Sequence, residues 1–133
     1  MATRNAVHTD VKVTITDRWI SGRRKYVTGT IKVQDPAQAD TLTYPENGIP
    51  LGSSSTDRGK FGFVRHMDSL EITDYNDNSE ALHSEYDKTN HTLRLYYIGQ
   101  TWGGADAWNE LATDDTFGHP TQGAAISFMA IGW

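Results

Sequence analysis

Short segments in which apolar and polar residues alternate run through this chain, with turn-forming residues between them. Residues 11–16 read Val-Lys-Val-Thr-Ile-Thr, and a similar alternation returns over 26–33. Successive side chains of a β-strand point to opposite faces of a sheet, so a period of two predicts half-buried strands. Ser21 and Gly22 predict a turn that makes these two segments an antiparallel pair, and Gly29 predicts a bulge or a close backbone approach.

Later segments repeat the pattern. The clearest hairpin joins 81–86 to 92–98 through an Asx-rich turn, with Leu93 and Leu95 facing the core and Arg94 and Tyr96 facing outward. The last segment is apolar on both faces, as in a strand buried within a sheet. The nearest approach to a helix is 105–112, where Asp106 could cap one short turn. Further strands are expected at 41–44, 61–64, 69–73 and 124–131.

These segments add up to about eight strands with little or no helix. The sequence therefore predicts an all-β protein, an antiparallel β-sandwich with the jelly roll as the leading topology. A chain of 133 residues has the size of one domain. We expect residues 1–9 to form a polar N-terminal arm and 10–133 to form a single β-sandwich domain.

Composition excludes several classes of function. The chain has no cysteine, which removes disulfide scaffolds, thiol nucleophiles and thiolate metal sites. Its 17 acidic and 12 basic residues give a net charge of −5, which argues against a nucleic-acid partner. No apolar run is long enough to cross a membrane as a helix, and the N-terminus carries no leader pattern, so we expect a protein made in the cytoplasm.

One acidic segment has the oxygen-ligand spacing of a calcium loop. Asp74, Asn76, Asn78 and Glu85 occupy its first, third, fifth and twelfth positions. Ser79 stands where the sharp turn needs glycine, and both flanks are predicted strands instead of helices. An Asx-rich turn between strands is therefore the favoured interpretation.

Catalytic patterns are missing. The serines at 53–55 lie outside any nucleophile-elbow motif, and nothing singles out a pair of carboxylates for glycoside hydrolysis. We therefore expect a protein that is not an enzyme and takes no cofactor.

Four tryptophans are many for a small core. Trp19 is expected to fill the core, whereas Trp102 and Trp108 could either cover the core or form a contact surface. Trp133 could close one end of the sandwich or insert into a neighbouring subunit. The long loop 45–60 is polar and rich in glycine and serine, which is typical of a functional loop or of one ordered by a partner.

An ordered set of short motifs resembles the small jelly-roll decoration, or cement, proteins of tailed-bacteriophage capsids. The resemblance covers roughly residues 40 to 132. Its motifs are Tyr-Pro-Glu-Asn-Gly-Ile-Pro-Leu-Gly at 44–52, Phe-Gly-Phe at 61–63, Tyr-Asp at 86–87, Leu-Arg-Leu-Tyr at 93–96 and Phe-Met-Ala-Ile-Gly at 128–132.

The resemblance implies a structural protein that binds the outer surface of the virion as a homotrimer and stabilises the lattice of the major capsid protein. The 45–60 loop and the N-terminal arm are then the expected contact elements. The expected contact residues are Tyr44, Pro45, Ile49, Leu51, Arg58, Trp102, Trp108 and Trp133. The alternative is a carbohydrate-binding module of a phage fibre or adhesin, with Trp102, Trp108 and Tyr96 as the stacking platform.

Overall fold

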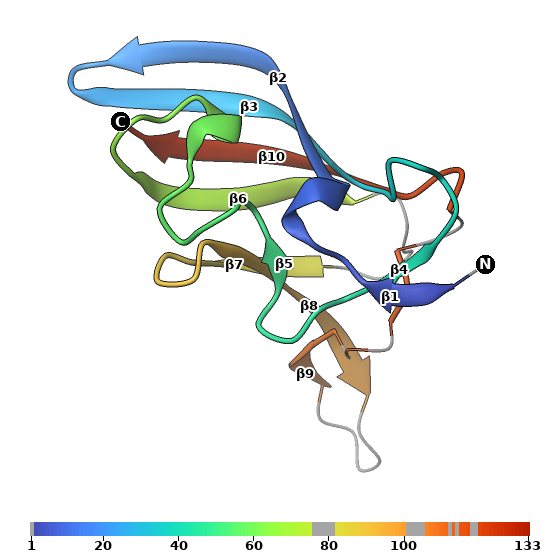
Figure 1. Cartoon of the computed structure of the whole chain (residues 1–133). Helices are drawn as coiled ribbons and strands as arrows, with labels where there is room; N and C mark the ends of the chain where they lie inside the picture. The colour runs from blue at the N-terminus through green and yellow to red at the C-terminus, as the bar shows by residue number, and fades with distance from the viewer. Residues whose placement is uncertain (1, 76–81, 101–105, 112, 114, 118–119) are drawn as a thin grey trace.

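The computed structural model describes residues 2–75, 82–100, 106–111, 113, 115–117 and 120–133. Over these residues the chain forms β-strands and two single-turn 3-10 helices (Figure 1). The elements are β1 (Thr3–Asn5), η1 (His8–Asp10), β2 (Val11–Ser21), β3 (Arg24–Val33), β4 (Thr41–Thr43), β5 (Ile49–Pro50), η2 (Gly59–Phe61), β6 (Met67–Tyr75), β7 (Leu82–Asp87), β8 (Thr92–Gln100), β9 (Asp106–Glu110) and β10 (Ala124–Gly132).

The larger sheet has the strand order β2-β3-β10-β6 and is antiparallel throughout. In β10, buried and half-buried residues alternate strictly, so one face of this sheet points into the core. The predicted β2–β3 pair is confirmed, and both strands extend beyond the predicted segments to the turn at Gly22. A register shift between Ile15 and Asp17 puts an extra residue in β2, next to Ile15, which lies opposite Gly29 of β3.

The smaller sheet has the order β5-β8-β7, with β9 on the other side of β8. The predicted hairpin is confirmed as β7 and β8, in which Tyr86 lies opposite Leu93. Leu93 and Leu95 are fully buried while Arg94 and Tyr96 are partly exposed, as the alternation predicts.

The core lies between the two sheets (Figure 1). The larger sheet contributes Val27, Ile31 and Phe128 among others, and the smaller sheet contributes Ile49 and Leu95. Each inner face is apolar because its side chains alternate with outward polar ones, and burying both faces against each other removes them from water. The antiparallel all-β sandwich is confirmed, and the jelly-roll connectivity stays a prediction.

One predicted strand is absent, and one segment without a clear pattern is a strand. Residues 61–64 were expected to form a strand, but η2 ends at Phe61 and Gly62 adopts a left-handed conformation with φ of 79°. That turn directs both Phe61 and Phe63 into the core, which produces an apolar alternation without a strand. The segment that came nearest to a helical pattern, near Asp106, forms the strand β9, and its pairing with β8 satisfies its backbone.

The start of the predicted N-terminal arm is docked on the domain. Strand β1 pairs in parallel with β4, matching Arg4 with Leu42. None of the helices in the described part of the chain is long and apolar enough to span a membrane.

Candidate interaction surfaces

The β2–β3 hairpin projects beyond the smaller sheet (Figure 1). Near its tip, β2 carries exposed apolar side chains. Trp19 is 42% exposed and stacks on Tyr26 with ring centroids 5.4 Å apart. The neighbouring Ile20 is 73% exposed. Trp19 was expected in the core, and that expectation is wrong. Because β2 runs past the smaller sheet here, the second sheet does not cover this part of the hairpin.

The C-terminus brings two further apolar residues to the same end of the sheet. Gly132 lies opposite Lys25 of β3, so Trp133 follows at the hairpin end. The backbone amide of Val64 donates to the carbonyl of Trp133 at 2.8 Å, and the amide of Trp133 donates to the carbonyl of His66 at 3.0 Å. Val64 is 91% exposed and Trp133 is 36% exposed. We call Trp19, Ile20, Val64 and Trp133 the apolar end.

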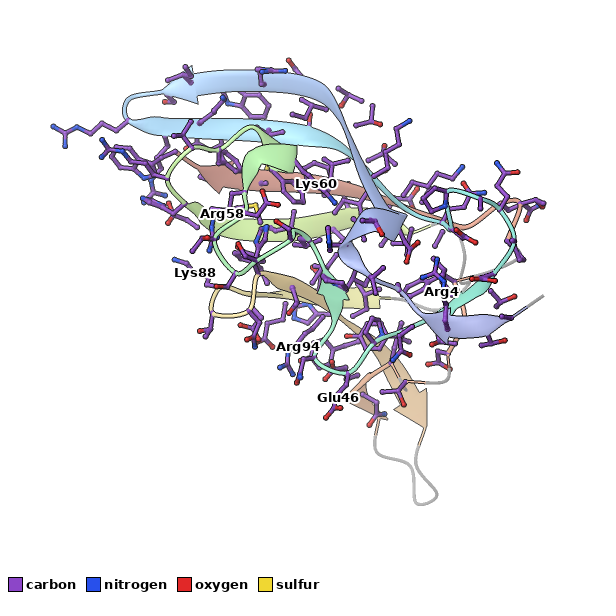
Figure 2. The ribbon with its side chains drawn as sticks, in the orientation of Figure 1. Arg4, Glu46, Arg58, Lys60, Lys88 and Arg94 are labelled. Atoms are coloured by element: carbon purple, nitrogen blue, oxygen red, sulfur yellow. The ribbon has the colours of Figure 1, made fainter. Side chains whose placement is uncertain are left out.

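A groove of about 660 Å³ lies at the opposite end of β2. Its basic residues are Lys12 and Lys32, which lie directly opposite each other on β2 and β3, and Lys60 from η2. Lys60 donates to the carbonyls of His8 at 2.6 Å and Val11 at 3.0 Å, and so fastens η2 to η1 and to the start of β2 (Figure 2). Burial lowers the pKa of Lys60. We call this region the lysine groove.

The carboxylates beside the lysine groove are held by Arg4. Its guanidinium donates to both oxygens of Asp10, at 2.7 and 2.8 Å, and to Asp40 at 2.8 Å, and it lies 3.4 Å from Asp35. Backbone amides, led by that of Asp40, lower the pKa of Asp35. These charge-assisted bonds join β1, η1 and the β3–β4 connection, so the cluster is a structural tether.

A buried polar group supports the predicted 45–60 loop. His91 is 1% exposed, has a φ of 53°, and its Nδ1 shares a hydrogen bond of 2.7 Å with the hydroxyl of Tyr86. Its backbone carbonyl accepts from the amide of Leu51 at 3.1 Å. Burial, together with the nearby charge of Arg58, lowers the pKa of His91 to about 4. The imidazole is therefore a neutral core group at pH 7.

Most of the expected contact residues on this loop lie inside the domain. Tyr44, Pro45, Ile49 and Leu51 are buried. The hydroxyl of Tyr44 donates to Glu110 at 2.8 Å and accepts from the amide of Leu95 at 3.1 Å. Arg58 is half-buried and donates to the carbonyls of Ser55 and Lys88. In the folded monomer these residues build the loop, whereas Trp133, among the expected contact residues that the structure describes, is exposed.

Two tryptophans of the expected set cannot be placed on a surface. Trp102 lies outside the described residues, and the side chain of Trp108, in β9, lies outside them too. The third member of the carbohydrate platform, Tyr96, donates its hydroxyl to Glu85 at 3.2 Å.

Of the four residues with the spacing of a calcium loop, the structure describes two. Asn76 and Asn78 lie outside the described residues, whereas Asp74 is in β6 and Glu85 is in β7. Over the described part of the chain, no group of three or more His, Asp or Glu side chains is arranged to hold a metal ion.

The sequence contains signals for both surfaces that alternation alone does not reveal. Trp19 and Ile20 are adjacent apolar residues directly before a turn, so one of them must point away from the core. Lys12 and Lys32 become neighbours only through the register of β2 on β3. Comparisons with family models, with curated proteins and with solved structures find no significant match for this chain.

Proposed function

We propose that this chain is a non-enzymatic structural protein of a bacteriophage particle, a capsid decoration protein. It binds the outer surface of the head as a homotrimer and stabilises the lattice of the major capsid protein. The observation that carries the proposal is the apolar end, where the exposed side chains of Trp19, Ile20, Val64 and Trp133 lie at the same end of the larger sheet.

Exposed large apolar side chains at one end of a small domain favour a protein–protein contact there. Tryptophan in particular is enriched among the residues that dominate binding energy. In a cyclic trimer each subunit contacts its neighbours through two different patches, so an apolar end on one copy meets another surface of the next. The ordered motifs over residues 40 to 132 supply the second support, because they resemble those of capsid decoration proteins.

The stabilising effect follows from linkage. A protein that binds the assembled lattice and not the dispersed capsid subunits shifts the equilibrium toward the lattice by mass action. Three docking sites per trimer add avidity, so no single contact has to be strong.

Two measurements test the proposal. Light scattering after size exclusion is expected to give a trimer, and the protein is expected to co-sediment with expanded capsids assembled without it and to raise their melting temperature. The double variant Ile20→Ser and Val64→Ser is expected to lose trimer formation or capsid binding, because both side chains are exposed and contribute little to the monomer's core.

Val7→Ser is the matched control, since Val7 is 45% exposed and precedes η1, away from the apolar end. It should assemble and bind like the parent chain. A protein that stays monomeric at every concentration and binds no capsid contradicts the proposal. Binding to glycans instead, lost in Trp102→Ala, would favour the carbohydrate-binding alternative.

A further inference from the structure

The lysine groove contains a pair of like charges that no described residue neutralises. Lys12 and Lys32 are directly opposite on adjacent strands, both are exposed, and neither ammonium forms a hydrogen bond or ion pair with a residue that the structure describes. Like charges in this position repel each other and destabilise the pair of strands. An isolated domain gains nothing from this arrangement.

The rest of the groove does not cancel this charge. Lys60 adds a third ammonium, two of whose protons are taken by the carbonyls of His8 and Val11. The one carboxylate in the lining, Asp10, is engaged by Arg4 and by the amide of Val7. The groove is thus a cationic site on a chain whose net charge is −5.

The shape and lining of the groove favour a polypeptide as the occupant. It follows the first residues of β2, an edge strand with β3 as its one strand partner in the described part of the sheet. Apolar Val11, Val13 and Pro36 lie in the lining together with the lysines. An extended segment presents alternate side chains on opposite sides, so it can direct carboxylates to the lysines and apolar groups to the half-buried Val13 and the exposed Pro36.

Phosphate is less well matched to this site. Lysine binds anions as a point charge and lacks the planar fork with which arginine grips a phosphate. The helical residues in the lining belong to η1 and η2, and each is a single 3-10 turn without an N-terminal cradle of amides.

We propose that the lysine groove binds an acidic, extended segment of a partner protein, whose carboxylates pair with Lys12 and Lys32. This inference is independent of the capsid proposal, because it concerns a different surface and can be tested without capsids. It gives the domain a second attachment point, at the end of β2 opposite the apolar end.

The test uses the whole 133-residue chain and a capped synthetic peptide that alternates glutamate and valine. Titration followed by NMR is expected to shift the backbone amides of residues 11–13 and 32–34. A peptide with glutamine in place of glutamate is expected to bind about tenfold more weakly or worse, because the ion pairs are lost. Raising the salt concentration should weaken binding of the glutamate peptide and leave the glutamine peptide almost unaffected.

Charge-reversal variants locate the site. The double variant Lys12→Glu and Lys32→Glu is expected to lower affinity for the glutamate peptide by at least about tenfold. Its fold should persist, since it replaces one exposed like-charge pair by another, and a thermal melt checks this. The matched control, Arg23→Glu with Arg24→Glu, makes the same change in net charge at the tip of the same hairpin and should keep the peptide's affinity.

Three results would overturn the proposal. The first is equal binding of the glutamine peptide, and the second is an equal loss of affinity in the Arg23 and Arg24 control. The third is inorganic phosphate shifting the same amides with an affinity equal to that of the glutamate peptide, which would identify a general anion site.

Discussion

Gly29 shows how one residue permits the larger sheet to form. It is buried in β3, and a Cβ at this position would collide with the backbone carbonyl oxygen of Thr14 on β2. We predict that Gly29→Ala destabilises the domain by about 1 to 3 kcal/mol, because the two strands must separate locally. Chemical denaturation measures the change.

Gly59→Ala is the control for that substitution. A Cβ at Gly59 would meet one atom of Asp57 at an ordinary distance of 3.7 Å. Its effect should stay within about 0.5 kcal/mol, as for ordinary surface changes. Equal effects of the two substitutions would contradict the role given to Gly29.

His91 couples the stability of the core to pH. Its folded pKa is about 4, below the ordinary value of 6.5, so the unfolded chain binds a proton more readily between these values. Stability that is fully present above pH 6.5 is therefore lost as the pH falls toward 4. The shift corresponds to at most about 3 kcal/mol.

The measurement is the free energy of unfolding against pH, for the parent chain and for His91→Asn. Asparagine tolerates the left-handed backbone that His91 adopts, so the loop can keep its path. The variant is expected to be less stable at pH 7 and to have a shallower slope between pH 4 and 6.5. An unchanged slope would show that other groups cause the pH dependence.

Arg4 adds a side-chain tether to the backbone pairing that holds strand β1 on the domain. Arg4 connects it to the buried carboxylate of Asp10 and to Asp35 and Asp40. We predict that Arg4→Met lowers the free energy of unfolding by roughly 2 kcal/mol, because it leaves the carboxylate of Asp10 buried without its partner. Water that reaches the partly exposed position of Arg4 limits the loss. Hydrogen exchange should show that the amides of β1 and β4 lose protection first.

Lys88→Met provides the comparison, since the ion pair of Lys88 with Asp68 is exposed and 3.6 Å long. Such a pair contributes little, so this variant should differ from the parent chain by less than about 0.5 kcal/mol. If Arg4→Met changed the free energy of unfolding as little as Lys88→Met does, Arg4 would not hold β1 on the domain.

At the scale of elements, the sequence predicts those strands whose alternation is set by one buried face. Strands β2, β3, β7 and β8 are of this kind, whereas β10 was predicted from a segment that is apolar on both faces. The failures have local causes: Gly62 turns the chain between Phe61 and Phe63, and β9 owes its form to pairing with β8 and not to its own pattern. The pairing of β1 with β4 is accompanied by an ion pair between the distant residues Arg4 and Asp40, which no periodicity reveals.

The candidate surfaces depend on the whole molecule and were harder to predict. Loop length and polarity pointed to the 45–60 loop, yet Ile49 and Leu51 are buried. The apolar end and the lysine groove arise where separate segments meet, through the register of β2 on β3 and the return of the chain at Trp133. Composition alone could not show that an acidic chain concentrates lysines at one site.

The net charge of the whole molecule and the opposed pair Lys12 and Lys32 can be separated by a single substitution. Lys12→Glu makes an acidic chain two charges more negative, which by itself increases self-repulsion. It also converts the opposed lysines into an ion pair across β2 and β3. We expect the local effect to dominate, raising the free energy of unfolding by about 0.2 to 1 kcal/mol at low salt. Arg24→Glu changes the net charge equally but lies opposite Ser21, so it should give no such gain. If Lys12→Glu is more stable than the parent chain and no longer binds the acidic peptide, the unpaired lysines serve a partner at the expense of folding stability. If Lys12→Glu is less stable, the opposed lysines do not lower the stability of the folded chain.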